Sequence, residues 1–137
     1  MRTAELRQRF AGGDVARLAT VRPDGWPHVV VVVFAVVGET VFTAVDRKPK
    51  RTTRLQRLEN LRHEPRCSLL VDHYEDDWTR LWWVRADGRA DVVDEPPASH
   101  PGLSALADRH PPYRTDPPHG PLIAVRVERW SGWTATP

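Results

Sequence analysis

The chain has 137 residues, a formal net charge of +2 and a single cysteine, Cys67. This length is typical of one domain with a real core, and the small net charge excludes a polycation that binds nucleic acid through bulk charge. A lone cysteine excludes an intrachain disulfide framework and a zinc site made only of cysteines. The longest apolar run, 29–37, is too short to span a membrane, and no secretory signal is visible. We therefore expect a cytoplasmic protein without membrane contact.

The first half of the chain predicts a short N-terminal helix followed by an antiparallel meander. Strands are expected at 15–21, 26–36 and 40–46, because Gly-containing and Pro-containing turns separate runs rich in β-branched residues. The middle strand is apolar on both faces, so its outer face must be covered by this chain's own helices or by a second subunit. We favour a second subunit, because the chain has few helices.

The second half predicts one more helix and three further strands. Leu55, Leu58 and Leu61 recur every three positions, which indicates a helix from residue 52 or 53 to 63. Strands are expected at 66–73, 78–94 and 122–127, with Asp87-Gly88 as a β-bulge that keeps the second of them one long, bent strand. Residues 129–133 are expected to be a tail.

Residues 95–121 carry eight of the thirteen prolines. We interpret them as a surface excursion with a short helix at 98–108, and not as a second core. The whole chain, 1–137, is then expected to be a single mainly β domain, a barrel or sandwich with short helices.

The segment 47–66 is the most basic part of the sequence, with eight of the twenty lysines and arginines against two glutamates. Its front part runs from a strand end into a helix start, where free backbone N–H groups and the helix dipole already favour an anion. This pattern predicts a site for a phosphate or a polycarboxylate. A solvated basic surface is the plainer alternative. A nucleic-acid patch would have interleaved aromatic residues, and the segment contains none.

Six tryptophans are the second signal. Trp82 and Trp83 are adjacent on a predicted strand, so they point to opposite faces and cannot both fill one core. One of them is expected at an interface or a coenzyme pocket; the plainer alternative is that both are buried structural residues. No catalytic constellation and no metal-ligand spacing is recognisable, so we expect no metal. A coenzyme that carries the hydride would make such machinery unnecessary.

Three blocks of sequence resemble a known family. Residues 16–28 (ARLATVRPDGWPH), 58–72 (LENLRHEPRCSLLVD) and 125–133 (VRVERWSGW) are similar to the pyridoxamine 5'-phosphate oxidase-like split β-barrels that bind flavins or deazaflavins. Within that superfamily, KPKRTTR at 48–54 and WWVR at 82–85 look most like the actinobacterial F420-dependent oxidoreductases.

The resemblance implies a homodimeric, FMN-binding-protein-like split β-barrel with a coenzyme site at the subunit interface. The coenzyme is expected to be F420, with FMN as the alternative, and its partner reactant a small conjugated organic molecule. The phosphate and oligoglutamate tail would meet five residues, and the ring would lie along the second and third strands near a tryptophan of the neighbouring subunit. These cofactor-binding candidates are Lys48, Lys50, Arg51, Thr52 and Arg57, with Trp78 or Trp82 at the ring. A non-enzymatic module that binds a coenzyme, a tetrapyrrole or nucleic acid is the remaining alternative.

Overall fold

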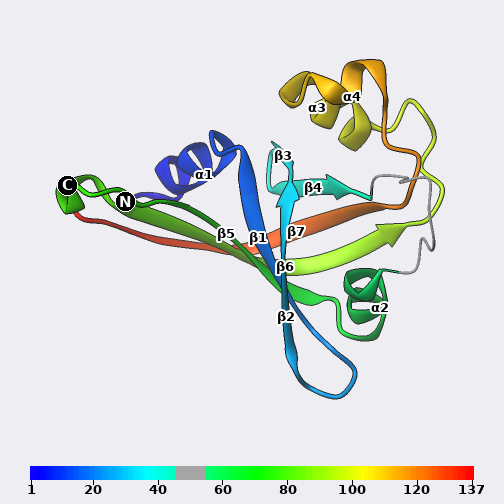
Figure 1. The fold of residues 1–137 in the computed structure, drawn as a ribbon, viewed down its shortest axis with the longest axis horizontal. Helices are drawn as coiled ribbons and strands as arrows, with labels where there is room; N and C mark the ends of the chain where they lie inside the picture. The colour runs from blue at the N-terminus through cyan, green and yellow to red at the C-terminus, as the bar shows by residue number, and fades with distance from the viewer. Residues whose placement is uncertain (46–54) are drawn as a thin grey trace.

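The computed structural model describes residues 1–45 and 55–137 (Figure 1). Its strands form one seven-stranded antiparallel sheet in the order β2-β1-β5-β6-β7-β4-β3. The strands are β1 Val15–Val21, β2 Pro27–Val33, β3 Ala35–Val37, β4 Thr40–Ala44, β5 Arg66–His73, β6 Trp82–Val93 and β7 Leu122–Thr134. The helices are α1 Thr3–Ala11, α2 Gln56–His63, α3 Pro101–Arg109 and α4 Pro112–Thr115, with a 3-10 turn η1 at Trp78–Arg80. No helix in these described ranges is long and apolar enough to cross a membrane.

One stretch of chain closes the sheet on itself. β2 pairs with β1 at one edge, β3 pairs with β4 at the other, and only Phe34 separates β2 from β3. The predicted single strand at 26–36 is therefore broken into two. Phe34 belongs to the register of neither ladder, and its carbonyl oxygen lies 2.6 Å from His110 Nε2, which donates a hydrogen bond to it. The result is the mainly β, curled sheet with short helices that the sequence predicts.

The interior of the curled sheet is filled by alternate side chains of its strands. Leu18, Leu69, Val84 and Val125 are fully buried there, as the period of two along each strand requires. Helix α1 places Leu6 and Phe10 in the same cluster, and the Phe10 ring lies 4.9 Å from that of Phe34. The core therefore spans the N-terminal helix and both sheet edges.

The proline-rich excursion is more than a surface decoration. Leu106 of α3 and Tyr113 of α4 form a second buried cluster with Phe42 of β4 and Leu122 of β7. The helices of 95–121 therefore pack on the sheet in a shared buried cluster, which the description of this segment as a surface excursion did not anticipate. Figure 1 shows α3 and α4 lying over β3 and β4, so this chain's own helices cover that part of the outer face.

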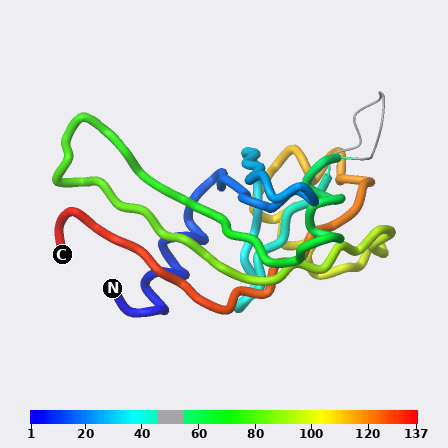
Figure 2. The backbone as a smooth tube through the Cα atoms, turned by 90° about the horizontal axis from the view of Figure 1, so that it is seen from below, coloured from blue at the N-terminus to red at the C-terminus, as the bar shows by residue number. Residues whose placement is uncertain are grey.

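The strands β5, β6 and β7 extend beyond the curled part as an arm. Figure 2 shows the β5–β6 hairpin and the C-terminal end of β7 projecting to the same side as the N-terminus. The expected tail at 129–133 is in fact part of β7, paired with β6 as far as Thr134. The predicted bulge is present, since the β6–β7 register shifts between Asp87 and Gly88.

The close packing of the bulge against β7 can be tested by substituting Gly88. A Cβ added there would lie 2.3 Å from the backbone oxygen of Arg126 on the neighbouring strand, so backbone must move to admit it. We expect Gly88→Ala to lower the free energy of unfolding by about 1–3 kcal/mol in urea denaturation. Gly12→Ala is the matched control, because its nearest contact would be 3.7 Å. Equal unfolding midpoints for the two variants would contradict the packing described here.

Candidate functional site

The outer face of β1 and β2 exposes large apolar side chains. Val29 and Val31 are 61% and 62% exposed, and Val15 and Val21 beside them on β1 are also exposed. Helices α3 and α4 cover the outer face at β3 and β4, but they do not reach these valines. Adjacent apolar side chains on the surface commonly mark an interaction site. This part of the sheet is therefore an open face, formed by the outward side chains of β1, β2, β5, β6 and β7.

Cross-strand register brings polar and aromatic groups onto the same open face. Val31 lies opposite Arg17, and Arg17 lies opposite Leu70 of β5. Leu70 in turn lies opposite Arg85 of β6. Directly paired residues point to the same side of a sheet, so this row runs across four strands on the outer face. Asp72 opposite Trp83 and Ser68 opposite Asp87 form the neighbouring rows.

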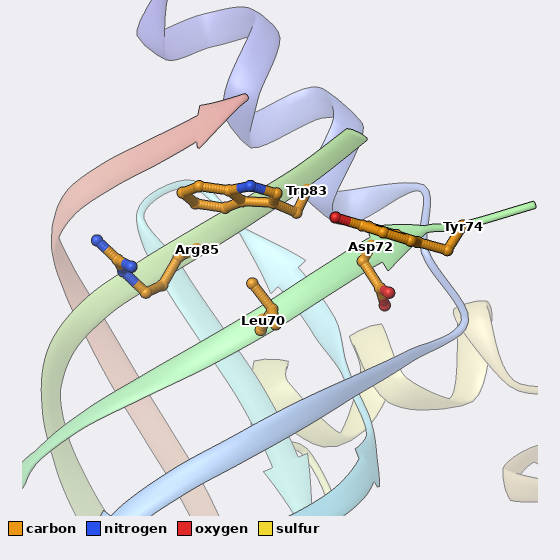
Figure 3. Close-up of a pocket in the computed structure, with 5 residues that line it drawn as sticks. All are labelled: Leu70, Asp72, Tyr74, Trp83 and Arg85. Carbon is orange, nitrogen blue, oxygen red and sulfur yellow. The ribbon is translucent and has the colours of Figure 1, made fainter. Parts of the chain in front are cut away.

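A hollow of about 420 Å³ lies on this face over β5 and β6, and we call it the aromatic hollow. Figure 3 shows Arg85 and Tyr74 at its two ends, Trp83 along one side, and Leu70 and Asp72 along the other. Its surface combines two aromatic rings, one aliphatic floor residue and groups of both charges. Concave sites of this composition are typical for small organic ligands.

A second hollow, of about 590 Å³, continues along the face and shares Arg85 with the first. Its lining includes Arg66, Ser68, Asp87 and Arg129. Asp87 accepts hydrogen bonds from Ser68 at 2.6 Å and from Arg129 at 3.1 Å, and Arg85 Nε lies 3.3 Å from its carboxylate. One carboxylate therefore holds two guanidinium groups on the open face.

Asp87 stays ionised in this setting. Burial opposes its ionisation, but the hydrogen bonds from Ser68 and Arg129, with Arg85 close by, outweigh burial and lower its pKa below the ordinary value. Asp72, on the side of the aromatic hollow opposite Trp83, pairs with Arg17 at 2.8 Å. The carboxylates of Asp72 and Asp87 are thus both engaged by arginines.

The start of α2 has a different character. Its N-cap residue is Leu55, whose side chain cannot accept a hydrogen bond, and Arg57 lies in its first turn. Gln56 donates to Asn60 at 2.8 Å, and buried Asn60 donates to Thr20 at 2.9 Å. His28, paired with Thr20 across the β1–β2 ladder, has a buried Nδ1 that meets no hydrogen-bond partner in the described part of the chain. This end of the sheet therefore holds polar groups that are not all satisfied.

Lys48, Lys50, Arg51 and Thr52 lie outside the described residues. Arg57 lies at the start of α2, as noted above, and is half-buried. Trp78 is 76% exposed on η1, at the tip of the β5–β6 hairpin. Trp82 is half-buried, and the Arg9 guanidinium lies over it, 5.2 Å from the centre of the Trp82 ring. Trp82 also lines a third hollow, between α1 and β5. The structure therefore does not bring Arg57, Trp78 and Trp82 together in one site.

The residues of the aromatic hollow were not among the predicted site residues. Alternation along a strand shows that Trp82 and Trp83 face opposite sides, and Trp83 is the one on the open face. Leu70, Asp72 and Arg85 join it only through the β5–β6 register, which no local pattern in the sequence reveals. Tyr74 follows β5 in an acidic loop and carried no separate signal.

Cys67 beside the second hollow is not a reactive thiol. Burial, with the nearby Asp87 carboxylate, raises its pKa to about 12, so it stays protonated at neutral pH. Within residues 1–45 and 55–137, no three His, Cys, Asp or Glu side chains gather as a metal site. The chemistry that these residues can perform is binding and orientation.

Several solved structures are similar to this chain. A conserved hypothetical protein from Mycobacterium tuberculosis is 25% identical, with a TM-score of 0.75 over 98% of this chain and 86% of that one. An F420 reductase is 30% identical, with a TM-score of 0.62 over 88% of this chain and 91% of that one. A FAD-binding protein from Mesorhizobium loti, 20% identical, has a TM-score of 0.72 over 96% and 94% of the two chains. No curated protein sequence matches significantly.

The similarity extends over the whole described sheet. The family model of pyridoxamine 5'-phosphate oxidase matches residues 3–134, which include every helix and strand of the structure. The curled antiparallel sheet with short helices is the split-barrel architecture expected of that family. This chain belongs to the pyridoxamine 5'-phosphate oxidase family.

Proposed function

We propose that this protein is an F420-dependent oxidoreductase that transfers a hydride between the deazaflavin and a small conjugated organic substrate. Family membership supports a flavin-type coenzyme, and the F420 reductase is 30% identical over most of both chains. The proposed working form is a homodimer, in which a second copy covers the exposed valines of β1 and β2 on the open face. When bound, the coenzyme supplies the hydride, and the protein needs only to bind and orient both reactants.

The start of α2 is the observation that carries this proposal. The helix begins without a side-chain cap, directly after the segment with Lys48, Lys50 and Arg51. Its first N–H groups and the positive end of its dipole favour an anion, and basic side chains there are unfavourable until one binds. In this proposal Lys48, Lys50, Arg51, Thr52 and Arg57 hold the phosphate and the carboxylates of the coenzyme tail.

The excess of basic residues favours F420 over FMN. FMN has one phosphate, whereas the F420 tail adds several carboxylates, and each charge-assisted hydrogen bond contributes about 1.5–3 kcal/mol. The ring is proposed to lie along β2 and β4. Trp78 is then the better candidate to contact the coenzyme of a neighbouring subunit, because it stands 76% exposed on a hairpin tip. Trp82 is packed under Arg9 within its own chain.

The coenzyme preference is tested by titration. We expect F420 to bind more tightly than FMN when fluorescence quenching is followed at moderate salt, because only F420 can use the whole basic segment. Equal affinities, or tighter FMN, would contradict the deazaflavin assignment and leave the fold unchanged.

The tail site is tested by charge reversal. Lys50→Glu removes one charge-assisted contact and adds a repulsion, so we expect about 30- to 1,000-fold weaker F420 binding. Arg2→Glu makes the same change in net charge, but Arg2 precedes α1 at the far end of the molecule from α2 (Figures 1 and 2). Thermal unfolding confirms that both variants are folded. Similar losses of affinity for both would indicate a general basic surface instead of a defined site.

The dimer is tested by sedimentation at low micromolar concentration. We expect roughly twice the chain mass of 15.6 kDa, since a stable interface of about 1,200 Å² or more can form on the open face. The double variant Val29→Asp, Val31→Lys should sediment as a monomer, because it buries two charges in the contact. Val37→Lys changes another exposed valine, on the β3–β4 hairpin, and should remain dimeric. A monomeric unmodified protein would rule out this assembly.

A further inference from the structure

The aromatic hollow has an aromatic and apolar lining and lies apart from the proposed tail site. It lies over β5 and β6, away from the start of α2, and none of its lining residues belongs to the proposed tail site. Trp83 is half-buried beside it and Tyr74 is 63% exposed, so two aromatic rings flank a space of about 420 Å³. Leu70 lines the side of the hollow opposite Trp83 and adds an apolar surface (Figure 3). A lining of this kind suits a flat ring system.

Arg85 has no carboxylate to itself at the aromatic hollow. Asp72 is neutralised by Arg17 at 2.8 Å. Asp87 is shared by Arg85 and Arg129, at 3.3 and 3.1 Å, and its lowered pKa keeps it at a single negative charge. One carboxylate is thus divided between two guanidinium groups. Arg85 is therefore only partly neutralised by Asp87, which favours an anionic ligand at its end of the aromatic hollow.

Arg85 presents this charge in a form that can recognise a carboxylate. Its Nε faces Asp87, whereas no hydrogen bond within residues 1–45 and 55–137 engages its terminal nitrogens. The guanidinium lies 5.5 Å from the centre of the Trp83 ring, which orients it beside the aromatic wall. Terminal nitrogens of arginine form paired, parallel hydrogen bonds with a carboxylate.

We propose that the aromatic hollow binds a planar aromatic carboxylate, with the ring against Trp83 and Tyr74 and the carboxylate on Arg85. This inference rests on the proposed function, because it names the class of substrate that would accept the hydride from the coenzyme. The conjugated substrate then gains a hydride from the reduced coenzyme and a proton from water, and the coenzyme is left oxidised. Arg85 is a binding residue in this scheme, and Asp87 positions it.

The test uses 2-naphthoate as the probe and naphthalene-2-methanol as its uncharged counterpart, measured by isothermal titration calorimetry on the intact protein without coenzyme. We expect 2-naphthoate to bind at least about tenfold more tightly than the alcohol, because only the carboxylate can use the guanidinium fork. Absence of 2-naphthoate binding, or equal affinity for both probes, overturns the proposal. The first of these outcomes is expected if side chains of a second copy fill the hollow.

Two arginine variants locate the contact. Arg85→Gln should weaken 2-naphthoate binding about tenfold or more and leave the alcohol unaffected. Arg129→Gln is the matched control: it removes the same charge from the same carboxylate, Asp87, but Arg129 does not line the aromatic hollow. Equal losses for both variants indicate a diffuse field and overturn the assignment to Arg85. Trp83→Leu should weaken both probes, since both stack on the indole.

Competition with F420 separates this inference from the proposed function. If F420 and 2-naphthoate bind together, with neither changing the other's site occupancy, both proposals stand. If 2-naphthoate binds but F420 does not, the hollow stands and the coenzyme assignment fails. If F420 displaces 2-naphthoate, the hollow belongs to the coenzyme ring and the substrate assignment is wrong.

Discussion

The run of chain from Pro27 to Val37 forms both edge strands of the sheet, pairing with β1 at its start and with β4 at its end. Because one continuous segment serves two edges, its pairing changes at Phe34, whose carbonyl oxygen accepts a hydrogen bond from His110 of the proline-rich excursion. Because the same segment pairs at both edges, the β1–β2 and β3–β4 ladders enclose one shared hydrophobic core. This closure also fixes which side chains point outward, so the open face and its hollows are consequences of the same constraint.

Closure divides the outer face into a covered part and an open part. Beyond Phe34, the cluster around Leu106 and Tyr113 buries Ala35 of β3. Before Phe34, Val29 and Val31 remain largely exposed. The doubly apolar strand thus has two explanations at once: this chain's own helices cover one end, and the other end is available to a second copy. The sequence pattern alone could not divide the strand, since both ends are equally apolar.

Local patterns predicted most elements well. β1 at Val15–Val21 and β5 at Arg66–His73 have the bounds expected from alternation and turn residues, and the bulge at Asp87-Gly88 was foreseen from a glycine in a long strand. The break at Phe34 was not, because it depends on a contact with His110, 76 positions away. The aromatic hollow escaped for the same reason: Leu70 and Arg85 meet only through strand register. The basic segment was found from its charge, and its role in binding remains a prediction.

An arginine on an exposed strand binds a carboxylate weakly, because water screens the charges and the side chain loses entropy on being fixed. Two features of the open face reduce these losses. Asp87, itself held by Ser68 at 2.6 Å, restrains the Arg85 guanidinium before any ligand arrives, and the Trp83 ring lies beside it. A second copy lying over the valines of β1 and β2 would exclude water from the neighbouring hollow and strengthen the remaining attraction. Ligand binding and dimer formation would then stabilise each other. If the dimer binds the ligand more tightly than the monomer by some factor, the ligand strengthens dimer formation by that same factor.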